Sequence, residues 1–190
     1  MTIQKAALWA AIGVLLRGLH YWVANMIPSW NSSGSIEQVT LIMVAIVDPL
    51  VWTYYFATIW RGLPNKIAAA LALVLGLAEI GFAGYRQYDS LSLESLDTLA
   101  FVFGGVVPVL CWTLYLLGRR FGLWYLLLYC LSQVALFVYQ TGSSAALIQE
   151  FWREEPWQLL AAPLIWIVYW VTQTLFVWAA QRRSTSADLA

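Results

Sequence analysis

Six long apolar stretches constrain this chain more than any other feature of its sequence. A helix needs roughly 20 residues, most of them apolar, to cross a hydrocarbon core of about 30 Å. We therefore predict an all-α fold, a polytopic membrane bundle of six transmembrane helices. The expected spans are 6–27, 38–60, 67–85, 98–118, 121–140 and 158–181.

The composition excludes several classes of protein. The chain is 62% apolar and 11% charged, with 10 basic and 10 acidic side chains, whereas soluble domains are roughly 45–50% apolar. The apolar share argues against a soluble globule, and the balanced charge excludes a basic nucleic-acid binder. One histidine and two separated cysteines, Cys111 and Cys130, do not suit a metal site or a disulfide framework. The chemistry that remains requires no cofactor.

The basic residues predict the orientation, because cytoplasmic loops are enriched in Lys and Arg. With both termini cytoplasmic, seven basic residues fall on the inner side and two, Arg86 and Arg153, on the outer side. We expect one transmembrane domain, residues 1–183, and a disordered cytoplasmic tail, residues 184–190. The sequence does not distinguish the plasma membrane from the endoplasmic reticulum. The inner basic residues are Lys5, Arg61, Lys66, Arg119, Arg120, Arg182 and Arg183.

Four ionisable residues fall within the first three spans. Arg17 and His20 share one face of the first span, because residues three apart are neighbours on a helix. Asp48 falls at the middle of the second span, and Glu79 lies slightly outward of the middle of the third. An ionisable side chain at the centre of a membrane helix costs on the order of 2.5–3.5 kcal/mol. Each of the four therefore needs a partner or a function.

Two interpretations of these charges stay open. In the first, Arg17 and Asp48 form a purely structural ion pair. In the second, the four residues line a cavity, and the carboxyl group that Arg17 does not pair with is kept neutral by desolvation, so that it can donate a proton. The donor is Glu79 if Arg17 pairs with Asp48, and Asp48 if it pairs with Glu79. His20 either relays a proton or only packs.

Prolines within the spans predict carbonyl groups without their usual helical partner. Pro49 frees the carbonyl of Ala45, and Pro108 frees that of Gly104. Such groups persist at membrane depth only beside protein or a wet cavity. A simple packing kink is the alternative for each proline.

Aromatic residues occur at membrane depth as well as at the interfaces. Trp52 and Tyr55 follow Asp48 at one and two helical turns, and so share its face. They pack in the core or line a cavity whose ring faces stabilise a cation, each ring contributing about 0.5–2 kcal/mol when desolvated. The full set of candidate cavity residues is Trp52, Tyr55, Trp112, Trp166, Tyr169 and Trp170.

The second and third spans resemble the EXPERA group, which includes the emopamil-binding sterol isomerases. The residues that carry this resemblance are Asp48-Pro49-Leu50-Val51-Trp52, Glu79-Ile80-Gly81 with Tyr85, and a proline in the fourth span. The resemblance implies that a sterol double bond moves through a protonated, cationic intermediate.

The last span is similar to that of the small integral-membrane terpene cyclases. The similarity lies in Ala162-Pro163-Leu164-Ile165-Trp166 with Trp178, together with an acid and a Trp in the second span. It implies that a buried carboxylic acid protonates an epoxide or an alkene, and that an aromatic pocket guides the cation.

Three functions remain open. The leading hypothesis is a membrane-embedded isomerase or cyclase of an isoprenoid or sterol-like lipid, with Asp48 and Glu79 as acid and base and Arg17 setting which is protonated. The second is a small-solute transporter or the substrate-binding subunit of one, with small residues at Ala6, Ala7, Ala10 and Ala11 meeting a partner. The third is a non-catalytic subunit of a membrane complex. The expected partners are the bilayer and a hydrophobic small molecule, in an oligomeric state that the sequence does not define.

Overall fold

The computed structural model describes residues 1–63, 65–87, 96–143 and 156–187. Within these ranges all regular structure is helical, and six helical spans are long and apolar enough to cross a membrane. The prediction of six transmembrane helices is therefore confirmed. The spans are Ile3–Ser29, Ser35–Trp60, Lys66–Tyr85, Leu96–Leu116, Leu123–Gly142 and Ala161–Arg183.

Three spans are single helices and three are interrupted. The third, fifth and sixth spans are formed by α5 (Lys66–Gln87), α8 (Leu123–Ser143) and α10 (Pro156–Ala187). In each of the others a five-residue π-helical segment lies between two α-helices. The first span contains α1 (Ile3–Tyr21), η1 (Trp22–Met26) and α2 (Ile27–Ser29). The second contains α3 (Ser35–Ile42), η2 (Met43–Val47) and α4 (Asp48–Trp60). The fourth contains α6 (Leu96–Phe101), η4 (Val102–Val106) and α7 (Val107–Leu116).

Each π-helical segment ends just before an X-Pro pair, and the proline explains it. The prolines are Pro28, Pro49 and Pro108, each at the second position of the following helix. A proline has no N–H and its ring collides with the carbonyl four residues before it. In all three segments the residue before the proline donates its N–H to the carbonyl five residues back. The wider turn makes room for the ring and leaves a carbonyl without a helical donor.

The carbonyl that Pro108 leaves free has a side-chain partner. The Tyr129 hydroxyl donates to the Gly104 carbonyl oxygen at 2.9 Å, and the Tyr125 hydroxyl donates to the neighbouring carbonyl of Phe103. The prediction that such a carbonyl persists beside protein is therefore confirmed at Gly104. These two bonds join the fourth span to the fifth.

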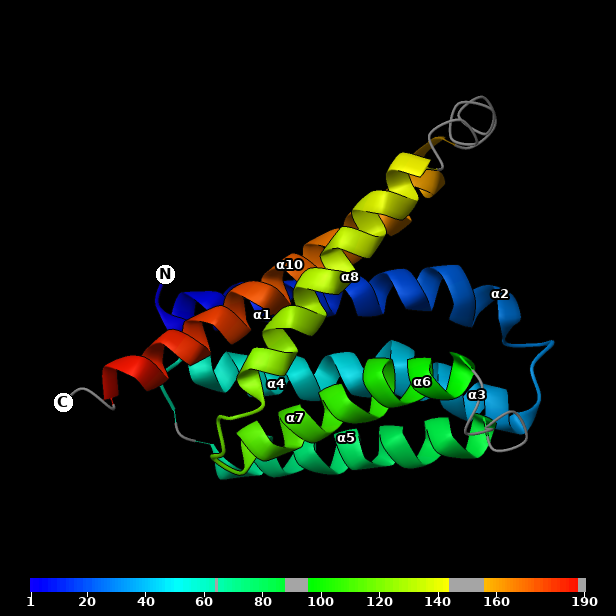
Figure 1. Ribbon diagram of the computed structural model, residues 1–190. Helices are drawn as coiled ribbons and strands as arrows, with labels where there is room; N and C mark the ends of the chain where they lie inside the picture. The colour runs from blue at the N-terminus through cyan, green and yellow to red at the C-terminus, as the bar shows by residue number, and fades with distance from the viewer. Residues whose placement is uncertain (64, 88–95, 144–155, 188–190) are drawn as a thin grey trace.

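The six spans form a closed ring of neighbours. α1 packs between α4 and α10 with the most extensive contacts in the structure. α4 contacts α5, α5 contacts α7, α7 contacts α8, and α8 contacts α10. Figure 1 shows that α8 and α10 run side by side and lean away from the other four spans toward the end opposite the termini. In the order of this ring, α5 lies across from α10.

Small residues let α1 approach both of its neighbours closely. A Cβ atom on Gly13 would collide with Thr172 of α10, and one on Gly18 would overlap the ring of Pro49. The alanines expected to meet a partner protein are instead buried within this chain, in the core formed with α4 and α10. That expectation is corrected, since the small-residue face is already covered. The alanines are Ala6, Ala7, Ala10 and Ala11.

The start of α1 and the end of α10 lie at the same end of the bundle (Figure 1). The turns at that end contain Gly62 and Gly118 with φ of 71° and 83°, a conformation that glycine adopts without a steric penalty. α10 continues as a helix to Ala187, beyond the boundary expected at residue 183. Residues 188–190 of the expected tail lie outside the described residues.

Candidate functional site

A chamber of about 190 Å³ lies inside the ring and is lined by residues from all six spans. It is smaller than the roughly 300–1,000 Å³ of pockets that hold drug-sized ligands. Seven of the ten residues predicted for the site line it. They are Arg17, Asp48, Trp52, Glu79, Trp112, Tyr169 and Trp170.

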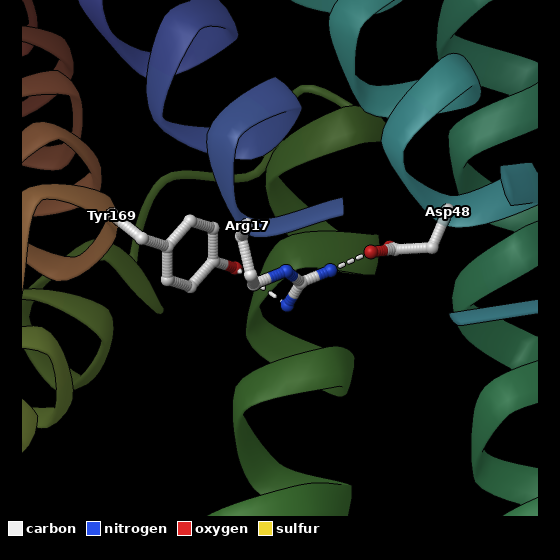
Figure 2. A network of polar contacts seen from close by, with 3 residues as sticks. All are labelled: Arg17, Asp48 and Tyr169. Carbon is white, nitrogen blue, oxygen red and sulfur yellow. Dashed lines mark hydrogen bonds and ion pairs between the residues drawn. The ribbon is translucent and has the colours of Figure 1, made fainter. Parts of the chain in front are cut away.

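An ion pair between Arg17 and Asp48 crosses one wall of the chamber. Figure 2 shows the Arg17 guanidinium between Asp48, at the start of α4, and Tyr169 of α10. Its Nη1 donates to the Tyr169 hydroxyl at 3.2 Å, and its central carbon lies 4.5 Å from the centroid of the Tyr169 ring. The pair is secluded, because the Arg17 and Asp48 side chains are 16% and 6% exposed. Of the two pairings left open by the sequence, the structure has Arg17 with Asp48.

The local sequence brings Asp48 to Arg17. Asp48 is the first residue after η2, and Pro49 directly follows it. The ring of Pro49 fits against Gly18, which has no side chain, so α4 and α1 approach closely at this depth. Arg17 directly precedes Gly18, and its long side chain reaches Asp48 at this depth.

Glu79 lies on α5 at the boundary between the chamber and a second opening. It is half-buried and lines both the chamber and a groove of about 640 Å³ between α5 and the fourth span. Gly105 and Val109 of the fourth span line both spaces as well. Among the described residues, Glu79 has no hydrogen-bond or ion-pair partner. It is therefore the carboxyl group of the chamber that is left without a paired base.

Aromatic rings form much of the remaining wall. Trp52 and Trp112 meet edge to face, with ring centroids 5.2 Å apart. On the opposite side of the ring of helices, Trp170 contacts Tyr169 at 4.8 Å and Tyr129 at 5.4 Å. Ring faces carry partial negative charge, so a cation inside the chamber would be stabilised by them.

Three predicted residues do not line the chamber. Tyr55 is buried in the core, where its ring contacts Trp52 at 5.7 Å. Trp166 stacks on Phe137, and its ring centroid lies 5.9 Å from the guanidinium carbon of Arg17. His20 is half-buried on α1 and lies outside the chamber lining. The structure therefore brings Arg17, Asp48 and Glu79 together without His20.

Some residues of the chamber were not singled out from the sequence as site residues. Gln173 is 4% exposed and lies three residues after Trp170, on the same face of α10. A glutamine at the middle of an apolar span is a signal of its own, because a buried amide needs hydrogen-bond partners. Tyr129, Cys130 and Phe56 line the chamber as well, and nothing in their spacing distinguishes them from core residues.

Comparisons of the chain with protein families, with curated proteins and with solved structures find no match. In the part of the chain that the structure describes, no three His, Cys, Asp or Glu side chains lie close enough to hold a metal ion. The proposal for function therefore rests on the geometry of the chamber.

Proposed function

We propose that this protein is a membrane-embedded isomerase or cyclase of an isoprenoid lipid, with Glu79 as the proton donor. The observation that carries the proposal is that, of two acids at one chamber, Asp48 is paired with Arg17 and, within the described residues, Glu79 is not. Asp48 is engaged by Arg17, whereas Glu79 faces the enclosed space without a paired base among the described residues. A carboxyl group in such surroundings favours its neutral, proton-donating form.

The proposed reaction moves one proton onto the substrate and removes another. The Glu79 carboxyl protonates one carbon of a double bond, which leaves a tertiary carbocation on the substrate and a carboxylate on Glu79. Ring faces of Trp52 and Trp112 stabilise the cation. Loss of a proton from a neighbouring carbon to the Glu79 carboxylate gives the shifted double bond and restores the acid. In a cyclase, a second double bond attacks the cation before this loss.

The size of the chamber favours an open-chain isoprenoid over a rigid sterol. A cavity of about 150 Å³ holds one benzene molecule, so 190 Å³ accommodates only the reacting end of a lipid. The groove beside Glu79, at about 640 Å³, offers space for the rest of the chain. A rigid, fused tetracyclic skeleton cannot bend so that one part occupies the chamber and the rest occupies the groove.

Proton transfer is tested by deuterium incorporation. The purified protein in lipid nanodiscs is incubated in D₂O with a panel of open-chain isoprenoid alkenes, alcohols and epoxides, and products are followed by mass spectrometry. Wild type should incorporate deuterium at carbon in at least one substrate. Glu79→Gln should slow incorporation at least about 100-fold, the lower end of what a positioned general acid contributes. Glu37→Gln, an exposed acid on α3, is the matched control and should leave the rate unchanged.

Two outcomes would contradict the proposal. One is a Glu79→Gln variant with the wild-type rate, which would remove Glu79 from the chemistry. The other is a wild type that binds probes of the panel yet never exchanges a carbon-bound proton. In that case a small-solute transporter, or its binding subunit, would fit the chamber better.

A further inference from the structure

Three buried N–H groups of chamber residues have no hydrogen-bond acceptor among the described residues. They are Nε of Arg17, Nε1 of Trp170 and Nε2 of Gln173. Gln173 is the most secluded of the three residues, at 4% exposure. A buried donor without an acceptor loses the full free energy of its hydration. Three such donors belong to residues that line one chamber, so a single acceptor-bearing ligand there would satisfy them.

The three residues that carry these donors come from two adjacent helices, on one side of the ring of spans. Trp170 and Gln173 are three residues apart on α10, and so share a face. Arg17 reaches the same wall from the adjacent α1, where it is hydrogen-bonded to Tyr169 of α10. Glu79 projects from α5, which is across the ring from α10. The chamber therefore has a donor wall, formed by Arg17, Trp170 and Gln173, and an acid on another side.

The charges at the chamber favour an uncharged acceptor. The positive charge of Arg17 is balanced by Asp48, so the donor wall has no net charge. A carboxylate or phosphate placed there would be desolvated without a free cation to compensate it, which is strongly unfavourable. A neutral carbonyl, ether or hydroxyl oxygen needs only the N–H groups that the wall supplies.

We infer that the donor wall is a subsite for an uncharged oxygen of the substrate, so that the substrate is an oxygenated isoprenoid. Its oxygen is held by Trp170 and Gln173, while the double bond to be protonated lies toward Glu79. The inference rests on the proposed function, because it takes the chamber as the place where the substrate reacts. Its test measures binding and needs no turnover.

A matched pair of small probes tests the subsite. The ketone 6-methyl-5-hepten-2-one and the hydrocarbon 2-methyl-2-heptene share one eight-carbon skeleton and differ in a single oxygen. Both probes are larger than benzene, which binds in a cavity of about 150 Å³, and they have the chamber of about 190 Å³ and the adjoining groove of about 640 Å³ available to them. Binding is measured by depletion of each volatile probe from the headspace over nanodiscs with protein, relative to empty nanodiscs. This reference removes partitioning into lipid.

Wild type should bind the ketone about tenfold more tightly than the hydrocarbon, as expected for two neutral hydrogen bonds. Gln173→Met and Trp170→Phe keep most of the side-chain volume but remove the donor. Each should reduce the preference for the ketone over the hydrocarbon about three- to fivefold. Gln181→Met and Trp178→Phe, on α10 but outside the chamber, are the matched controls and should bind both probes as wild type does.

Equal binding of the two probes by wild type would overturn the inference, whatever the variants do. So would a preference for the ketone that survives both Gln173→Met and Trp170→Phe. A variant that no longer folds is recognised because it loses hydrocarbon binding as well. In that case the comparison of ketone and hydrocarbon binding by wild type decides whether the inference holds. Failure of the proposed function gives a different pattern, in which the ketone preference is present but no deuterium is incorporated.

Discussion

The buried pair of Arg17 and Asp48 gives the sharpest prediction of stability. Asp48→Asn preserves the shape of the side chain and removes its charge, which leaves the guanidinium without a counterion. Removing one partner of a buried pair costs about 3–5 kcal/mol. Arg17 retains its hydrogen bond to Tyr169 and its contact with that ring, so we expect a loss near the lower limit, about 3 kcal/mol of unfolding free energy.

The same reasoning predicts a partial rescue. When Arg17→Met is combined with Asp48→Asn, no charge is left buried in this wall. We expect the double variant to be at least about 1 kcal/mol more stable than Asp48→Asn alone, because a buried pair replaced by neutral groups is often tolerated. Reversible unfolding by sodium dodecyl sulfate in mixed micelles, followed by tryptophan fluorescence, measures both differences. Glu37→Gln, which alters an exposed acid, should stay within about 0.5 kcal/mol of wild type.

A loss below about 1 kcal/mol for Asp48→Asn would refute the argument, since it would lie in the range of exposed pairs. So would a double variant whose loss equals the sum of the two single losses. That result would mean that the two side chains do not depend on each other.

Three further predictions concern packing, a freed carbonyl and orientation. Gly18→Ala should destabilise the bundle by about 1–3 kcal/mol, because its methyl group overlaps the rigid ring of Pro49; unfolding free energies equal to wild type would contradict the close approach. Tyr129→Phe should cost about 1 kcal/mol by leaving the Gly104 carbonyl without a donor, and an unchanged stability would show that another group replaces the hydroxyl. A Ser32→Cys variant in sealed membrane vesicles of known sidedness should react with a membrane-impermeant thiol reagent added to the non-cytoplasmic face, since the positive-inside rule predicts that this turn lies on that face. Reaction only from the cytoplasmic face would reverse the predicted orientation, and the wild-type chain, whose two cysteines are buried, is the unlabelled control.

The sequence was sufficient to predict the spans, because hydropathy depends only on neighbouring residues. It also identified Arg17, Asp48 and Glu79, since ionisable side chains are rare within apolar stretches. The pairing of Arg17 with Asp48 needed the depth and rotation of two helices, and these are set by η2 and by the contact between Gly18 and Pro49. Neither feature is visible in helical periodicity alone.

The aromatic residues show a second limit of the sequence. Trp52 and Tyr55 share a face of the second span, as predicted, but only Trp52 lines the chamber. The chamber faces the row formed by Trp52 and Phe56, which are one turn apart on α4, whereas Tyr55 is rotated away from that row and packs in the core. Gln173 is a residue that the sequence did not mark for the site but that lines the chamber. It lies far from Arg17 in the chain, and the small-residue packing of α1 against α10 brings the two helices together.

Arg17 contacts Tyr169 and Asp48, which lie at very different distances from it along the sequence, and this affects the order in which the contacts form during biosynthesis. Tyr169 follows Arg17 by 152 positions, which at a ribosomal rate of about 5–20 residues per second corresponds to a delay of roughly 8–30 s. Asp48, from the very next span, emerges far sooner and neutralises the arginine while the remaining spans are still being translated. A nascent chain therefore holds a charge-balanced helical hairpin early, but the chamber is complete only once α10 has inserted and closed the ring.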